Sequence, residues 1–302
     1  MKSLGILLTA VTLLSAFEYD LKPEKVNDKV YCFFGKAEVI NTQNNGNMVN
    51  SCFADLGNKW LAIDSGPTFA YAKEAFGKIE AIKKMPVAAV IDTHVHDDHW
   101  LGNGFYLSQG TEVFGPSAFK KEVDPSAATR MERRVSKEAY ALTTPKLPTT
   151  FVDQNMTLHI DGNEIRLIKV ARKAHTSGDI LVYLPKMQTL FCGDVVFNDR
   201  LPSLRDGDIN GWIATLEMIK AMPLKSIIGG HGKAVGRDAA DMTYRYLVEL
   251  RSEVKAAIDD DIGIGNAVRT IKMPAFSSVG LYNEMQAQNV EAAYRTLEWS
   301  DE

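Results

Sequence analysis

The sequence predicts a mixed α/β (α+β) fold in which two β-sheets pack together and helices cover the outside. Two observations lead to this prediction. Strand-like and helix-like segments occur in two similar blocks, and a proline-rich loop at 143–150 separates these blocks. The chain has 302 residues, with 45% hydrophobic and 24% charged residues, which is the composition of a globular protein. Sheets with one apolar face bury it against each other, and helices cover the outer faces.

The first block is expected to contain mainly strands, divided by Gly and Asn clusters such as the one at 41–47. Its longest apolar run, PVAAVIDTH, is typical of a buried strand. Proline is favoured at helix starts, so Pro67 and Pro116 mark the expected helices. The expected elements are strands at 30–35, 49–57 and 59–66, a helix from Pro67 towards Met85, a strand at 86–94 and a helix over 116–141.

The second block repeats this order, and a helical tail over 237–302 follows it. The expected elements are strands at 156–161, 163–171, 179–186 and 189–197, a helix from about Gly211, and a strand at 225–230 that leads to His231. In the tail, the segment 242–258 has apolar residues at helical spacing. We expect it to pack on the two-sheet body, and the alternatives are a cover for the active-site mouth or a dimer contact.

The N-terminus has the pattern of a secretory signal peptide. Lys2 precedes an apolar stretch at 4–17, which is too short to span a membrane comfortably, and Ser15-Ala16 offers small residues for cleavage. We therefore expect a signal peptide over 1–16, export to a bacterial periplasm, and one mature domain over 17–302 without stable membrane insertion. The formal net charge of −4 disfavours nucleic acid as a partner and leaves a small molecule as the expected substrate.

Three cysteines remain for the mature chain: Cys32, Cys52 and Cys192. Cys32 and Cys52 fall in consecutive predicted strands, and an oxidising compartment would permit a disulfide between them. They are equally consistent with small buried apolar residues. No CxxC pattern indicates a cysteine zinc site.

The segment IDTHVHDDH at 91–99 contains three of the six histidines of the chain. Imidazole and carboxylate groups at the end of a buried strand are suitable zinc ligands. Three further residues, His175, Asp194 and His231, each lie near a predicted strand end, beside Gly or other small residues that permit tight turns. His159 lies in an alternating strand and is interpreted as an ordinary surface or packing residue.

The motifs HVHDDH, AHTSGD, FCGD and GGHG, in this order, resemble the metallo-β-lactamase superfamily, and LAIDSGP at 61–67 resembles its early strand and turn. The resemblance extends from about residue 30 to His231. It implies a four-layer αββα sandwich with two metal ions, expected to be zinc, at one edge of the sheets. His94, His96 and His175 would bind the first ion, Asp98, His99 and His231 the second, and Asp194 would bridge both.

The resemblance also implies a hydrolase that attacks an acyl bond in a β-lactam, lactone or thioester with a metal-bridging hydroxide. Asp98 is the expected catalytic residue, which would orient the water or transfer its proton. Asp64 would hydrogen-bond a ligand histidine or its loop, or only form a turn, and Asp97 would serve as a loop or supporting carboxylate.

The ligand set is most similar to glyoxalase II-type enzymes, and WLGNG and NVEAAYRTLE resemble exported β-lactamase-like zinc hydrolases. The alternative is an iron-dependent persulfide dioxygenase with one iron at His94, His175 and Asp194. A binding protein with a decayed site is disfavoured because all seven ligands are present. The expected substrate contacts are Trp100, Phe197, Asn198 and Arg200. Arg200 would pair with a carboxylate or make only ordinary loop contacts, and Arg205 is interpreted as a loop residue.

Overall fold

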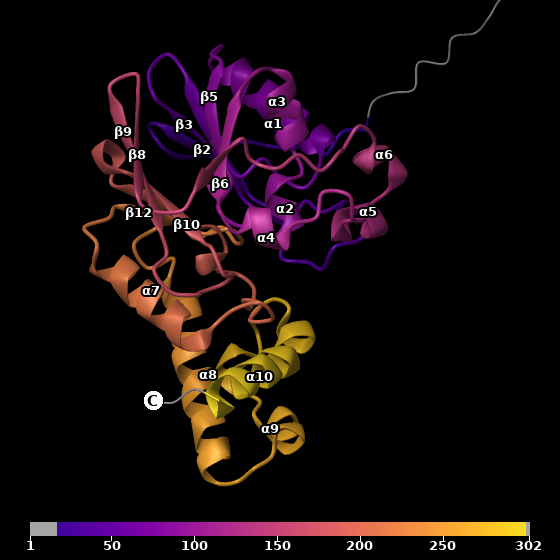
Figure 1. Cartoon of the computed structure of the whole chain (residues 1–302), viewed down its shortest axis with the longest axis vertical. Coiled ribbons are helices and arrows are strands. Elements are labelled where there is room, and N and C mark those ends of the chain that lie inside the picture. The colour runs from indigo at the N-terminus through magenta and orange to yellow at the C-terminus, as the bar shows by residue number, and fades with distance from the viewer. Residues whose placement is uncertain (1–16, 300–302) are drawn as a thin grey trace, which may run out of the picture.

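Two β-sheets, one from each half of the chain, form the centre of the molecule (Figure 1). The structure is a computed structural model, and it describes residues 17–299. The first sheet has the strand order β1 (Glu24–Asn27), β2 (Val30–Phe33), β3 (Ser51–Asp55), β4 (Trp60–Ile63), β5 (Val87–Ile91), β6 (Glu112–Pro116) and β7 (Thr150–Val152). Its first four strands are antiparallel, and β4 to β7 run parallel.

The second sheet follows β7 in the chain. Its strand order is β12 (Ser226–Ile228), β11 (Thr189–Phe191), β10 (Ile180–Leu184), β9 (Asn163–Lys169) and β8 (Met156–Ile160). Only the β11–β12 pair is parallel. A crossover through α7 (Ile209–Ala221) connects β11 to β12, as parallel neighbours require.

Three layers of buried apolar side chains hold the sandwich together. The central layer contains residues of both sheets, such as Ile91 and Val182. On the outer face of the first sheet, Phe53 and Trp60 pack with α1 (Phe69–Ile82) and α3 (Asn103–Ser108). On the outer face of the second sheet, residues such as Leu190 pack with α7 and the C-terminal helices. This is the expected αββα architecture.

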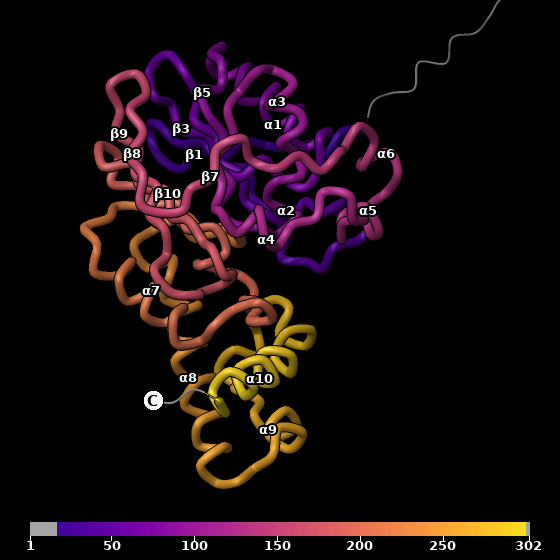
Figure 2. Tube along the Cα trace, viewed as in Figure 1, coloured from indigo at the N-terminus to yellow at the C-terminus, as the bar shows by residue number. Residues whose placement is uncertain are grey.

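The C-terminal helices are α8 (Asp241–Asp259), α9 (Ile264–Thr270) and α10 (Tyr282–Glu298), with a short 3-10 helix η3 (Pro274–Phe276). Figure 2 shows them gathered beyond α7, on the side of the second sheet. Their apolar faces are continuous with the core on that sheet, because Leu247 and Val290 belong to the same buried cluster as Leu190. The expected helical tail is thus present, and it is divided between α8 and α9 and again at η3.

The single helix expected over 116–141 is wrong. Pro116 ends β6, and three short helices follow: α4 (Phe119–Glu122), α5 (Arg130–Arg134) and α6 (Lys137–Tyr140). Thr129 and Ser136 each accept a hydrogen bond from a backbone N–H three residues later and so begin new helices. Pro125, between α4 and α5, has no N–H to continue a helix.

Cys32 and Cys52 form a disulfide between β2 and β3, where they face each other in register. Cys192 is a buried free thiol, and burial raises its pKa. The expected signal peptide at 1–16 lies outside the described residues. Within residues 17–299, no helix is long and apolar enough to cross a membrane.

Candidate metal centre

The predicted ligands come from loops at the carboxyl ends of strands in both sheets. His94 and His96 follow β5, and α2 (Asp97–Trp100) carries the next two ligands of the HVHDDH motif. His175 lies between β9 and β10, Asp194 lies in the 3-10 helix η2 (Gly193–Val195) after β11, and His231 follows β12. Both sheets therefore contribute to one site.

The structure brings all seven residues together in two groups, and within each group the donor atoms lie within 4.8 Å of one another. The groups are His94, His96, His175 and Asp194, and Asp98, His99 and His231. Asp194 lies between them: its Oδ1 is 3.1 Å from His99 Nε2, and its Oδ2 is 3.3 Å from the Nε2 atoms of both His175 and His231. The carboxylate of Asp194 therefore lies between the two groups, and the bridging role that the resemblance implies for it stays a prediction.

Four of the five histidines are held through the ring nitrogen that faces away from the centre. The contacts are His94 Nδ1 to Thr93 Oγ1 (3.0 Å), His99 Nδ1 to Asp64 Oδ2 (2.8 Å), His231 Nδ1 to the Met48 carbonyl oxygen (2.6 Å) and His96 Nε2 to Asp206 Oδ2 (3.1 Å). Such partners fix the ring orientation and leave the other nitrogen free as a ligand. Asp64 thus has the supporting role that the sequence left open.

Several atoms at the centre fit a bound cation. His94 Nε2, His99 Nε2 and Asp194 Oδ1 are buried, and none of them has a hydrogen-bond partner within residues 17–299; the 3.1 Å between the last two is an ion-pair contact. Buried polar atoms without partners are costly unless another group satisfies them. Imidazole and carboxylate donors suit zinc or iron, so the residues fit a divalent metal ion.

The electrostatics of the centre also favour a cation. Burial lowers the pKa of His94 far below its usual value, which leaves its imidazole neutral and able to bind a metal ion. Burial alone would also lower the pKa of His99, but the carboxylates of Asp194, Asp64 and Asp98 outweigh it and raise that pKa. A site that stabilises a proton on a buried imidazole stabilises positive charge in general, including that of a metal ion.

Arg130 is a part of the site that sequence reasoning missed. It begins α5 and donates from Nη2 to Asp98 Oδ1 (2.6 Å) and from Nε to Asp97 Oδ1 (3.0 Å). Burial would raise the pKa of Asp98, but Arg130 and the nearby histidines outweigh it and hold that pKa below its usual range. Arg130 was expected inside a long helix, and no local sequence signal indicates its contact with residues more than thirty positions earlier.

Gly230 permits the close approach of two loops at the centre. A Cβ atom at this position would lie 2.0 Å from Asp194 Oδ1. Asn50 fixes the same loop from the first sheet, since its Nδ2 donates to the carbonyl oxygens of Gly229 (3.0 Å) and Gly232 (2.7 Å). The GGHG motif therefore serves packing around Asp194 as well as presentation of His231.

A cleft of about 170 Å³ opens onto the centre. Among the predicted substrate contacts, Phe197 and Arg200 line it, and the Phe197 ring stacks on the His231 ring at 5.0 Å. The structure does not bring Trp100 or Asn198 to the cleft. Trp100 is buried against Phe119 and donates to the Val95 carbonyl oxygen.

The side chain of Asn198 is used for a loop contact. Its Nδ2 donates to the Ala234 carbonyl oxygen, and its Oδ1 accepts from the Ala234 N–H. Both polar ends of the amide are therefore occupied within the fold. The remaining predicted residues lie where expected for their minor roles: His159 is exposed on β8, and Asp97 accepts from Arg130 and from the Met131 N–H.

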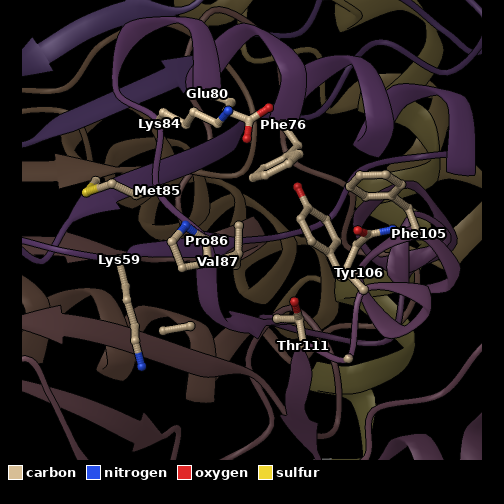
Figure 3. Close-up of a pocket in the computed structure, with 13 residues that line it drawn as sticks. Lys59, Phe76, Glu80, Lys84, Met85, Pro86, Val87, Phe105, Tyr106 and Thr111 are labelled. Carbon is tan, nitrogen blue, oxygen red and sulfur yellow. The ribbon is translucent and has the colours of Figure 1, made fainter.

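A larger pocket of about 520 Å³ lies at the opposite ends of the strands, beside the starts of β5 and β6 (Figure 3). The aromatic rings of Phe76, Phe105 and Tyr106 line one side of this pocket, and Lys59 and Lys84 line other parts of it. It contains none of the histidines. The larger pocket is therefore not the candidate active site, and the cluster of donor atoms identifies the smaller cleft as that site.

Comparison with known proteins agrees with the geometry. A model of the metallo-beta-lactamase superfamily matches residues 44–231. The metallo-beta-lactamase IND-1 of Chryseobacterium indologenes is 24% identical over 177 residues, which are 56% of this chain and 66% of that protein. The chain thus spans just under two thirds of the length of this relative.

Solved structures show the same fold. A metallo-beta-lactamase from Pontibacter korlensis superposes with a TM-score of 0.60 at 20% identity and covers 76% of this chain and 99% of its own. The structure of VMB-1 gives a TM-score of 0.60 at 19% identity, with 77% and 99% covered. Because the family match spans more than half of the residues and includes all seven residues of the donor cluster, this chain belongs to the metallo-beta-lactamase superfamily.

Proposed function

We propose that this protein is an exported, dinuclear zinc-dependent hydrolase that attacks an acyl bond in a β-lactam, lactone or thioester. The observation that carries the proposal is the pair of complete donor groups with Asp194 between them. His94, His96 and His175 would hold the first ion, and Asp98, His99 and His231 the second. The relative named as a metallo-beta-lactamase supports a hydrolytic reaction.

When bound, the two ions would polarise the substrate carbonyl and make a hydroxide nucleophile available near neutral pH. The residues of the chain position the other participants. Arg130 holds Asp98 Oδ1, so the carboxylate is fixed while its Oδ2 faces His99 and His231 at 3.9 and 3.8 Å. A carboxylate fixed in this way stays ionised and can orient a water molecule by accepting a hydrogen bond from it.

Two further observations bear on the proposal. The second donor group is intact, which favours two ions over the single iron of a persulfide dioxygenase. The Cys32–Cys52 disulfide supports export, because such bonds persist in oxidising compartments and are rare in the cytosol.

Metal analysis and one substitution test this function. We expect two zinc ions per chain by elemental analysis, and hydrolysis of at least one of nitrocefin, a lactone or a thioester. Asp98→Ala should lower the hydrolysis rate by about 100-fold or more, because it removes the carboxylate that orients the attacking water. The exposed Asp153→Ala is the matched control and should leave the rate unchanged.

Full activity of the Asp98→Ala variant would contradict the assigned role. One tightly held iron per chain, together with oxygen uptake in the presence of glutathione persulfide, would show that the protein is the alternative persulfide dioxygenase and not a hydrolase. Circular dichroism of both variants establishes that any loss of rate does not come from unfolding.

A further inference from the structure

The cleft is built partly by helices that lie outside the family match, which ends at His231. Leu281, Met285 and Gln288, from the start of α10, line the cleft together with the histidines. A second apolar contribution comes from Val39 and Ile40, in the loop between β2 and β3. Apolar side chains from two segments distant in sequence therefore border the same opening.

The C-terminal segment also holds the loop that presents Arg200. Gly280 pairs with this loop through its backbone: its N–H donates to the Asp199 carbonyl oxygen (3.1 Å), and its own carbonyl accepts from the Leu201 N–H (2.8 Å). A Cβ atom at Gly280 would lie 2.5 Å from the Asp199 oxygen, so the approach requires glycine. The loop position thus depends on the C-terminal segment.

Asn289 of α10 extends this attachment. It is 1% exposed, and its side chain donates to the Pro202 carbonyl oxygen (2.8 Å) and accepts from the Leu204 N–H (2.9 Å). Backbone and side-chain bonds therefore fix the loop on both sides of Arg200. A side chain on such a support is preorganised for binding.

Arg200 itself is a buried cation without an anionic partner. It is 6% exposed, its guanidinium lies 5.4 Å from the centre of the Phe197 ring, and its one hydrogen bond runs from Nε to the Leu201 carbonyl oxygen at 3.4 Å. Within residues 17–299 no carboxylate forms an ion pair with it. Burial lowers its pKa, and the more distant Asp194 and Asp98 offset this effect only in part.

The two other arginines of the cleft differ in this respect. Arg130 is paired with Asp97 and Asp98, and Arg205 is paired with Asp206. A buried charge is costly unless it is paired and hydrogen-bonded. Arg200 is therefore the guanidinium of the cleft that has capacity for an anion supplied from outside the chain.

We infer that the C-terminal helices complete the substrate site, and that the site selects acyl compounds carrying a carboxylate next to an apolar group. Arg200 binds the carboxylate, and Met285 and Leu281 of the α10 end contact the apolar group together with Ile40. This inference rests on the proposed function for the reaction, but the recognition of the carboxylate is a binding property. It can be measured without hydrolysis.

The test is isothermal titration calorimetry of the full, zinc-loaded chain with 3-phenylpropanoate and its neutral amide, 3-phenylpropanamide. We expect the carboxylate to bind about 10- to 100-fold more tightly than the amide, since hydrogen bonds to charged groups are strong. Arg200→Met should abolish this preference. Arg295→Met is the matched control, because Arg295 lies on α10 but pairs with Glu291 on the exposed face, and it should keep the preference.

A second substitution tests the apolar contacts of the site. Met285→Ala should weaken binding of both compounds by a similar factor, whereas Met218→Ala, exposed on α7, should change neither. Zinc content and the melting temperature of each variant identify loss of metal or fold. A preference that persists in Arg200→Met would show that the metal centre alone holds the carboxylate, and this would overturn the inference.

The two proposals fail in different ways. If Arg200 binds the carboxylate but no acyl substrate is hydrolysed, the proposed hydrolase function is wrong and the proposed carboxylate site is supported. If the protein hydrolyses an acyl substrate but binds the acid and the amide equally well, the hydrolase function is supported and the proposed carboxylate site is wrong.

Discussion

At the scale of single residues, Asp64 determines which nitrogen of His99 can bind a metal ion. Its Oδ2 contacts His99 Nδ1 at 2.8 Å and accepts from the Thr93 hydroxyl, and its Oδ1 accepts from the Thr93 N–H. An acceptor at Nδ1 keeps the proton there and leaves Nε2 as the ligand. The backbone of Asp64 is left-handed, with φ of 56°, which Asn also tolerates.

We expect Asp64→Asn to weaken the affinity for the second zinc ion by about 10- to 100-fold. The amide nitrogen would face the Nδ1 proton of His99, and the tautomer that relieves this contact carries its proton on Nε2. A competition titration with a coloured chelator measures the affinity. Asp161→Asn is the control, since Asp161 is exposed and also left-handed, with φ of 48°. Equal zinc affinities in both variants would remove this role from Asp64.

The residues of the donor cluster could be identified from the sequence as candidate metal ligands, because they are polar and lie beside strand ends and glycines. Arg130 and Asp206 could not, although both contact predicted ligands. Their positions depend on how the segments 117–149 and 198–208 fold, and no local pattern in either segment indicates which distant residues these side chains contact. Trp100 and Asn198 were expected to line the cleft because they are close in sequence to predicted ligands. Closeness in sequence does not determine the direction in which a side chain points.

At the scale of elements, the Cys32–Cys52 bond joins β2 to β3 across a separation of 20 residues. A crosslink of this length reduces the entropy of the unfolded chain, so removing it should lower the free energy of unfolding by about 3 kcal/mol. Urea denaturation of Cys32→Ala/Cys52→Ala measures the loss. Dithiothreitol should destabilise the wild type and the Cys192→Ala variant but not the double variant. A double variant as stable as the wild type would contradict the expectation.

The strands of the central layer could be predicted because their residues are continuously apolar, as in β5 and β10. Three short strands of the first sheet could not. β1, β6 and β7 have three to five residues each, and their pairing depends on neighbours distant in the chain. In the segment 116–141, Pro116 suggested the start of one helix, but the capping side chains at Thr129 and Ser136 divide the segment.

At the scale of the whole molecule, the metal centre joins the two sheets, since its residues follow β5 on one side and β11 and β12 on the other. Ions would bind at this centre in the folded chain and not in the unfolded chain, and they would therefore raise the free energy of unfolding. Removing them with a chelator should lower the free energy of unfolding by about 4 kcal/mol if the metal had been present at 1,000 times its Kd.

Urea unfolding with and without chelator, followed by tryptophan fluorescence and circular dichroism, measures this effect. The two signals should coincide in one transition, because the C-terminal helices share a core with the second sheet. Adding zinc back should restore the stability, whereas calcium, which prefers oxygen ligands, should not. An unchanged urea midpoint after metal removal would contradict the prediction.

The 2.0 Å between a Cβ at Gly230 and the Asp194 oxygen has a consequence for inheritance. Every amino acid that can replace glycine carries a Cβ, so each missense change in this codon would push the loop of His231 away from Asp194. Exposed positions of α8 or α10 can accumulate changes over generations without touching the centre. Synonymous changes in codon 230 leave the protein unaltered, so we expect this position to vary in its DNA sequence while the encoded residue stays glycine.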